Sequence, residues 1–429
     1  MKQHSRADIF IIGFALFSMF FGAGNVIFPP YLGMGSGPQW IIGFLCYYLA
    51  DIGLALLSMF SMFRLGGSEP IVSPIGKIPS TILMCAIVLC IGPMLAIPRT
   101  AATTFEMSIA PLLPNTSTVV FSIAFFLLIL LLTMRETSVV DIVGKVLTPM
   151  LLIGLLILII KGITTPLGEI SLSALTENVA STGIKAGYQT MDVLATMLFG
   201  VLILSSAESK GYTEPRVRCK VAVQSGLVAG VILLVVYGGL TYLGATASTM
   251  YDLSISRSAL VLAIVEGLLG KVGTVIFAIV VALACITTAV GLVSACADYF
   301  SVLSHDRLSY RLLVVVICVF SAVVSNVGLE QLVAIAAPVL DIVYPPALVL
   351  IGLSFLKALP VHVYRMATLG ALLFSSLTAL STYAHISIPF LNALPLASLG
   401  FGWIVPAVLF GLLGLVMARM SHCTAAADR

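Results

Sequence analysis

Apolar residues run in long blocks along the whole chain, and short polar or Gly/Pro-rich segments separate these blocks. Val119–Thr133, Leu151–Ile160, Val272–Ala284 and Leu312–Val324 are examples. A helix needs about 20 mostly apolar residues to cross the roughly 30 Å hydrocarbon core of a membrane. Counting such stretches predicts about twelve membrane-spanning helices, which begin near residues 9, 38, 79, 117, 139, 186, 219, 272, 310, 328, 367 and 401. The blocks do not alternate between apolar and polar residues, so a transmembrane β-barrel is not expected.

The basic residues indicate how these helices are oriented. An even number of spans places both termini on the same side of the membrane. If that side is the inside, only four of the 21 Lys and Arg residues, namely Lys161, Lys185, Arg257 and Lys271, lie in outer connections, and Arg99 lies within a span. Because positive residues collect on the inner side, this asymmetry predicts that both termini are inside.

The two longest polar connections, residues 161–185 and 245–271, fall outside the membrane in this topology. Each contains a run that can form one or two turns of helix. We expect short surface helices at Leu172–Val179 and at Ser258–Leu269.

Composition excludes several classes of protein. Of the 429 residues, 60% are hydrophobic and 9% are charged, whereas about a quarter of an average soluble domain is charged. The small net charge of +3 is spread along the chain, which argues against a nucleic-acid partner. No CxxC pair and no GxxxxGK[ST] loop occur, so a zinc site or a nucleotide partner is not expected. We therefore predict a protein of the lipid bilayer that is not an enzyme and has no organic cofactor.

The first apolar block is interrupted near its middle by Gly22–Asn25, and Pro29 and Pro30 follow. Backbone groups left unpaired at membrane depth are tolerated only where they are buried in protein or line a cavity. In secondary transporters, such a break marks the binding site, because free amides face an anionic group and free carbonyls bind a cation. The alternative is close helix packing at the small residues, with a proline kink near the outer end.

A second break is expected in the sixth span if the chain is an inverted repeat of five helices plus five. Thr190–Gly200 supplies an intramembrane carboxylate at Asp192, hydroxyls at Thr190 and Thr196, and a glycine, Gly200, at midspan. In the eighth span, Thr287 and Thr288 stand beside small residues, and their oxygens suit a hard cation. Alternatively, each hydroxyl bonds a carbonyl one turn earlier in its own helix.

Charged residues also lie within or at the edge of the expected spans, where each is costly unless it is paired or hydrated. They are Asp51, Arg99, Glu106, Asp192, Asp298 and Asp341. Arg99 and Glu106 are seven residues apart, hence on one face of the third span and two turns apart. We interpret Arg99 as a fixed structural cation that pairs across helices with Asp192 or Glu106. A gating role or a proton relay is the alternative.

Five long stretches together resemble the bacterial branched-chain amino-acid:cation symporters, the LIVCS or BrnQ-type carriers of the APC superfamily. These stretches are Phe21–Pro30, Gly92–Glu106, Thr190–Gly200, Thr288–Phe300 and Ser325–Leu332. The resemblance covers nearly the whole chain. It implies one transmembrane domain over residues 1–429 with the leucine-transporter fold: a first repeat over about 9–160, a second over about 186–352, and two further helices over about 367–420. It also implies a location in the bacterial cytoplasmic membrane.

The resemblance further implies uptake of the amino acids Leu, Ile and Val with a monovalent cation, usually Na⁺. In that fold a sodium ion lies between the first and eighth spans. The matching oxygens are the carbonyls of Ser18, Phe21 and Ala284 and the hydroxyls of Thr287 and Thr288. A second ion in some relatives uses an Asn in the first span and a Thr in the sixth, which Asn25 and Thr196 match. The seventh span lacks the Asn that would complete that site, so one ion is expected.

The substrate carboxylate would then accept hydrogen bonds from amides of Gly22–Asn25, and the substrate ammonium would face carbonyls near Met197–Phe199. An apolar side-chain pocket is expected from Phe21, Met94, Met197 and Phe199. The complete predicted substrate set is Phe21, Gly22, Ala23, Gly24, Asn25, Met94, Met197, Leu198, Phe199 and Gly200.

Three other functions stay open on the sequence. A carrier of the same kind can be coupled to H⁺ instead of Na⁺, or can carry another small neutral solute. The same helices can also form a passive channel or a sensor. A channel is disfavoured because repeated polar rings are absent and the polar residues concentrate at one level of the spans.

Overall fold

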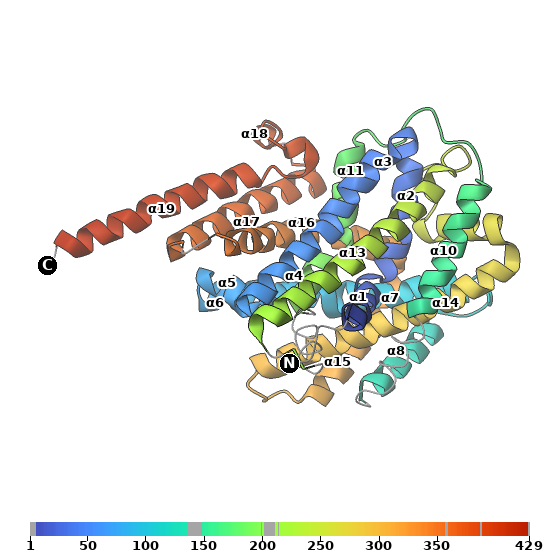
Figure 1. Cartoon of the computed structure of the whole chain (residues 1–429), viewed down its shortest axis with the longest axis horizontal. Helices are drawn as coiled ribbons and strands as arrows, with labels where there is room; N and C mark the ends of the chain where they lie inside the picture. Colours follow the sequence, from blue (N-terminus) through green and yellow to red (C-terminus); the bar gives the residue numbers. More distant parts are fainter. Residues whose placement is uncertain are drawn as a thin grey trace.

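The computed structural model describes residues 6–134, 148–198, 200, 211–212, 214–356, 359–386 and 388–427, and all regular elements in these ranges are helical. The helices pack side by side into one body, from which the end of the chain extends (Figure 1). The α-helices are α1 (Arg6–Phe20), α2 (Ala23–Ser36), α3 (Trp40–Tyr48), α4 (Leu54–Leu65), α5 (Glu69–Val72), α6 (Lys77–Leu89), α7 (Ala96–Thr104), α8 (Thr118–Met134), α10 (Thr148–Thr164), α11 (Val179–Thr190), α13 (Pro215–Ala245), α14 (Arg257–Leu303), α15 (Tyr310–Val324), α16 (Leu329–Ser354), α17 (Val361–Tyr383), α18 (Pro389–Asn392) and α19 (Ile404–Ala427).

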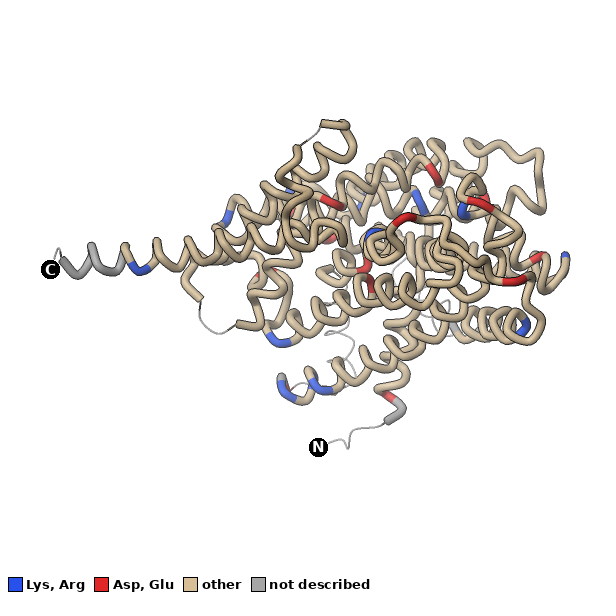
Figure 2. The backbone as a smooth tube through the Cα atoms, turned by 90° about the horizontal axis from the view of Figure 1, so that it is seen from above, with Lys and Arg blue, Asp and Glu red and all other residues tan. Residues whose placement is uncertain are grey.

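Several of these helices can cross a membrane. In the described ranges, seven helical runs are long and apolar enough: Ala23–Leu65, Lys77–Ile109, Arg216–Ala245, Arg257–Leu303, Tyr310–Val327, Leu329–Ser354 and Val361–Tyr383. Shorter apolar helices lie at Asp8–Phe20, Thr118–Met134, Leu151–Thr164 and Ile404–Met420. Long stretches of the backbone carry no charged residue (Figure 2). The predicted all-helical, polytopic membrane fold is confirmed, while the fifth predicted start, near residue 139, lies outside the described residues.

One of the two predicted surface helices exists. Residues 257–269 form the first part of α14, and Gly270 then bends the helix with φ of +65°, a conformation that glycine adopts readily. The other prediction, Leu172–Val179, is wrong, because residues 172–178 form turns and bends. Leu172 is fully exposed and buries no apolar face, and the Asn178 side chain accepts a hydrogen bond from Ser181 N to start α11.

Four spans are interrupted near the centre of the bundle. Phe21 and Gly22 separate α1 from α2, and Met191 ends α11 with φ of +71°. A π-helical turn around Asp51, η2 (Leu49–Gly53), joins α3 to α4. In the third span, η4 (Cys90–Met94) contains the non-helical Gly92 before α7 begins. Such π turns are rare and are frequently found at functional sites.

Small residues allow the interrupted helices to approach closely. A Cβ atom on Gly33 of α2 would lie 1.8 Å from the carbonyl oxygen of Thr241, and one on Gly244 of α13 would lie 1.9 Å from that of Pro30. The backbones of α2 and α13 are therefore in direct contact, which is typical of helix packing in membranes. α17 and α19 pack against each other in the same way, with Gly370 against Phe410, and α19 extends away from the bundle (Figure 1).

Candidate functional site

The break between α1 and α2 leaves backbone groups unpaired. The amide of Gly22 donates to the carbonyl of Phe20 at 3.0 Å, whereas a continuous helix would direct it to Ser18. Gly22 has an extended conformation and precedes α2 without a side-chain cap. The first amides of α2 are therefore free to bind an anionic group. The break lies where Gly22–Asn25 predicted it.

The second break lies earlier than the sequence indicated. Met191 takes the left-handed conformation, and residues 192–198 are helical again. Met197 and Leu198, whose carbonyls were expected to be free, thus lie inside a helical segment, and Phe199 lies outside the described residues. Gly200 serves packing, because a Cβ atom there would lie 2.7 Å from the sulfur of Met62.

Arg99 binds the carbonyl end of α11. The side chain is 4% exposed and donates hydrogen bonds from Nη1 to the carbonyl of Gln189 at 2.5 Å and from Nη2 to that of Thr190 at 3.1 Å. These carbonyls are free because α11 ends there, and the negative end of a helix dipole favours a cation. The hydrogen-bond acceptors of Arg99 are therefore carbonyls, whereas a carboxylate was expected, and its role as a fixed structural cation stays a prediction.

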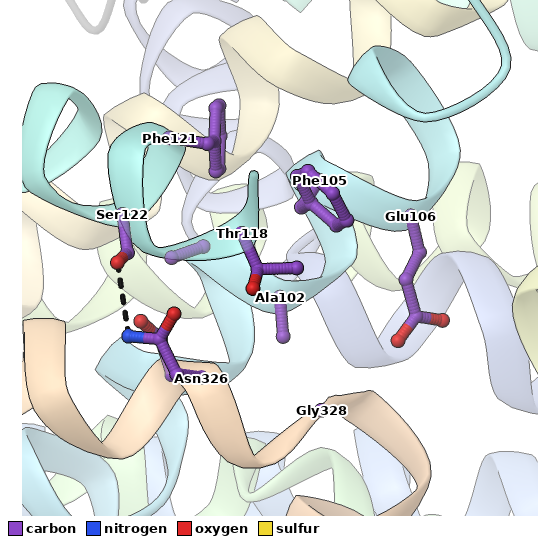
Figure 3. A pocket seen from close by; sticks show the side chains of 10 residues that line it. Ala102, Phe105, Glu106, Thr118, Phe121, Ser122, Asn326 and Gly328 are labelled. Carbon is purple, nitrogen blue, oxygen red and sulfur yellow. Dashed lines mark hydrogen bonds between the residues drawn. The ribbon is translucent and has the colours of Figure 1, made fainter. Parts of the chain in front are cut away.

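Glu106 was one of the two predicted partners of Arg99, and this pairing is wrong. Its carboxylate accepts hydrogen bonds from the Ser258 hydroxyl at 2.5 Å and from the Leu329 amide at 3.1 Å. Figure 3 shows Glu106 beside a pocket that Asn326 and Gly328 also line. Glu106 therefore ties the third span to the starts of α14 and α16, because the π turn η5 (Phe105–Ile109) directs it there.

A buried polar network joins α2, α13 and the helical segment after Met191. Asn25 donates from Nδ2 to Asp192 Oδ2 at 2.8 Å and to the Tyr237 hydroxyl at 2.6 Å. Thr190 donates its hydroxyl to Asp51 Oδ1 at 2.7 Å. Asp192 and Arg99 line the same cavity, and the described part of the chain shows no direct ion pair between them. Asp192 thus lies directly after the break at Met191, and Asp51 is hydrogen-bonded to the end of α11 directly before that break.

Asn25 and Thr196, the predicted pair for a second ion, have separate partners. The Thr196 hydroxyl donates to the carbonyl of Val193 at 2.5 Å, within its own helix. The Asn25 amide is occupied by Asp192 and Tyr237.

A small cavity lies between the two breaks. Its volume is about 30 Å³, enough for about two water molecules. The lining residues are Met19, Phe20, Gly22, Ala23, Asn25, Ile91, Ala96, Arg99, Thr100, Thr190, Met191, Asp192, Ala195, Thr288 and Leu292. The cavity thus combines a cation, an anion, free helix-start amides and apolar side chains.

Of the predicted sodium residues, Thr288 lines this cavity, whereas Ser18, Phe21, Ala284 and Thr287 do not. A Cβ atom on Gly22 would lie 3.6 Å from the Thr288 hydroxyl, so the first break and α14 are in contact. The Thr288 hydroxyl is buried and has no hydrogen-bond partner. The Thr287 hydroxyl instead donates to the carbonyl of Ala284 at 2.8 Å, which was the alternative for these threonines. The sodium site itself stays a prediction.

Some of the remaining predicted substrate residues line the cavity, and others do not. Gly22, Ala23 and Asn25 line the cavity. Gly24 packs against Arg99, and Phe21 stacks on Phe17 with ring centroids 5.5 Å apart. Met94 and Met197 do not line the cavity.

Met94 is 42% exposed, which contradicts its expected place in the side-chain pocket. The irregular backbone at Gly92 and Leu95 turns Met94 outward, and Ile91 lines the cavity from this span. The hydroxyl-bearing Tyr47, Tyr237 and Tyr344 and the carboxylate of Asp51 are also near the site. Sequence reasoning noted Asp51 as an intramembrane charge and missed the tyrosines.

Comparison with known proteins agrees with this architecture. Residues 5–421 match the model of a family described as branched-chain amino acid transport protein. The branched-chain amino acid permease BrnQ of Salmonella typhimurium is 36% identical over 427 residues, covering 97% of each chain. The branched-chain amino acid transport system 3 carrier protein of Pseudomonas aeruginosa is 38% identical over 419 residues, covering 95% of each.

Two solved structures share the fold at low sequence identity. Mhp1, a nucleobase-cation-symport-1 family transporter in a closed conformation, has a TM-score of 0.66 and 14% identity over 96% of this chain and 93% of its own. A Na⁺-coupled sialic acid symporter has a TM-score of 0.61 and 12% identity over 95% and 90%. The fold is thus that of the leucine-transporter type. On the family match and the identity to its relatives, the chain belongs to the branched-chain amino acid transport protein family.

Proposed function

We propose that this protein is a secondary symporter that takes up Leu, Ile and Val together with Na⁺ across the bacterial cytoplasmic membrane, with both termini inside. The single observation that carries the proposal is the cavity between the two breaks, where Arg99, Asp192 and the free amides of α2 meet. Opposite charges and free amides are what a zwitterionic amino acid requires. The names of the relatives point to branched-chain substrates.

In this proposal the substrate carboxylate binds the amides at the start of α2, and the ammonium lies beside Asp192. The side chain contacts apolar groups of the cavity wall, such as Phe20, Ile91 and Leu292. Polar amino acids are disfavoured because their side chains would be buried without a hydrogen-bond partner.

Transport by alternating access then requires the cavity to change, because its present volume of about 30 Å³ is too small for leucine. A sodium ion between α1 and α14 would favour the arrangement that admits substrate. Coupling follows when the ion binds the two arrangements with different affinities.

The test is leucine uptake into proteoliposomes, with each of the twenty amino acids as competitor, with and without Na⁺. We expect saturable uptake that needs Na⁺ and that Ile and Val inhibit most. Counterflow of labelled leucine excludes a passive channel, because an open pore does not exchange substrate in this way. Uptake without any Na⁺ dependence would contradict the proposal.

Thr288→Ala should raise the Na⁺ concentration for half-maximal uptake severalfold, because it removes the unpaired buried hydroxyl beside Gly22. Thr288→Ser keeps the oxygen and should have a milder effect. Thr287→Ala is the matched comparison, and its effect should be smaller if the bond from Thr287 to Ala284 persists when the ion binds. Unchanged Na⁺ dependence in a well-expressed Thr288→Ala protein would disprove the assignment.

Arg257→Ala should slow uptake severalfold while equilibrium leucine binding is retained. Arg257 forms an ion pair with Glu330, and its guanidinium lies 4.7 Å from the centre of the Tyr31 ring. These contacts tie α14 to α16 and α2 on the proposed outer side, so their loss should disturb closure. Glu330→Gln should act in the same direction, whereas Arg311→Ala, at the start of α15, is the control. Equal loss of binding and uptake would instead place Arg257 in the substrate site.

A further inference from the structure

A second group of buried oxygen atoms lies around Asp51, beside the cavity but outside its lining. Asp51 is 0% exposed, and its Oδ2 atom has no hydrogen-bond partner. Tyr47 and Tyr344 are also 0% exposed, and their hydroxyls likewise lack partners. Buried polar atoms are nearly always hydrogen-bonded, so three unpaired oxygens in one region need an explanation.

These groups belong to one buried cluster. Tyr47 lies one turn before Asp51 in the same helical run. The Tyr47 ring packs edge-on against Tyr237 with centroids 5.6 Å apart. The Thr190 hydroxyl donates to Asp51, and Asp192 follows Thr190 by two residues, so the two carboxylates lie on either side of the end of α11. Carboxylate and hydroxyl oxygens thus converge from α3, η2 and the segment after Met191.

The charges in this region do not balance. In the part of the chain that the structure describes, the buried charged side chains are Asp51, Asp192 and Arg99, and Arg99 donates its hydrogen bonds to carbonyls. Two carboxylates and one guanidinium leave a net negative charge among buried groups, which is costly in a membrane protein. A zwitterionic amino acid brings no net charge, so the imbalance persists when substrate binds.

We propose that Asp51, Asp192 and Tyr47 form a binding site for a second sodium ion, separate from the site at Thr288. This inference rests on the proposed sodium-coupled function. A hard monovalent cation matches an all-oxygen donor set, and one such ion neutralises the remaining charge. Neither the resemblance nor the pair Asn25 and Thr196 indicated this location.

The site has a direct consequence for coupling. Asp192 holds Asn25 at the start of α2, and Asp51 accepts from Thr190 at the end of α11. An ion between the two carboxylates therefore contacts the supports of both broken spans. Its binding depends on the relative position of these spans, which is the requirement for linkage between ion and substrate.

The test is the number of sodium ions moved with each leucine. In proteoliposomes held at zero membrane potential, a tenfold sodium gradient balances a roughly hundredfold leucine gradient when two ions move, and a roughly tenfold one when a single ion moves. We expect the wild-type protein to show the hundredfold balance. Asp51→Asn should reduce it to the tenfold balance, and Ser58→Ala, which removes a buried hydroxyl from the same span, should leave it unchanged.

Tyr47→Phe keeps the ring packing and is the second variant to use if Asp51→Asn does not fold. Binding of ²²Na⁺ to the purified protein should have two components, one for each proposed site. Tyr47→Phe should weaken one component severalfold, and Thr288→Ala should weaken the other. One sodium ion per leucine in the wild-type protein would overturn this site and leave the proposed function intact. A leucine balance that follows a pH gradient would overturn sodium as the second cation. Uptake independent of Na⁺ would instead disprove the proposed function.

Discussion

Asp192→Asn is expected to abolish most of the sodium-driven leucine uptake while the protein still inserts into the membrane. The substitution removes the anion that faces the cavity beside Arg99 and replaces the acceptor of the 2.8 Å hydrogen bond from Asn25. Loss of a hydrogen bond to a charged group costs about 1.5–3 kcal/mol. If that cost falls on the transport cycle, uptake decreases roughly 10- to 100-fold.

The measurement compares two driving forces. Uptake is recorded with a sodium gradient at equal internal and external pH, and again with a pH gradient in the absence of sodium. Asp298→Asn is the matched control, because Asp298 is an exposed carboxylate on α14 that does not line the cavity. Accumulation by the wild-type protein under the pH gradient alone would contradict sodium coupling and would identify Asp192 as the main candidate for proton transfer.

The first break could be predicted from the sequence because its cause is local. Gly22 and Gly24 lower helix stability wherever the chain places them, and an apolar block of that length must lie in the membrane. The second break has no such signal. Met191 has a side chain that disfavours positive φ, so the packing around the end of α11 enforces its conformation. The glycine at position 200 suggested a later break, and the structure uses it for helix packing.

The hydrogen-bond acceptors of Arg99 are a second feature that the sequence alone could not predict. From the sequence, a buried guanidinium is expected to pair with a carboxylate, and Asp192 and Glu106 were the candidates. The structure supplies carbonyls of Gln189 and Thr190 instead. Those carbonyls become acceptors only because α11 ends at Thr190, so the interaction could not be anticipated without the position of the break.

The tyrosines of the site were missed for a different reason. Tyr47, Tyr237 and Tyr344 occur within apolar blocks, where an aromatic residue is usually a packing residue. The Tyr237 hydroxyl, for example, becomes informative only because α13, distant in sequence, brings it to Asn25, which also binds Asp192.

Gly24→Leu is expected to reduce leucine uptake at least about 100-fold, because there is no room for the new side chain. A Cβ atom at Gly24 would lie 2.9 Å from Arg99 Nη2 and 3.2 Å from Phe28 Cε2. Arg99 can move away only by breaking its hydrogen bonds to Gln189 and Thr190, which costs about 1.5–3 kcal/mol for each bond to a charged group.

The measurement is leucine uptake together with equilibrium binding of leucine to the purified variant, after size-exclusion chromatography has shown that it is folded. Gly154→Leu on α10 is the matched control, because nothing lies within 4 Å of a Cβ atom there, and it should transport like the wild-type protein. Gly24→Ala adds the Cβ atom alone and should have an intermediate effect. If Gly24→Leu binds leucine with wild-type affinity, Gly24 has no part in the site, and the contact between α2 and Arg99 is not required for substrate recognition.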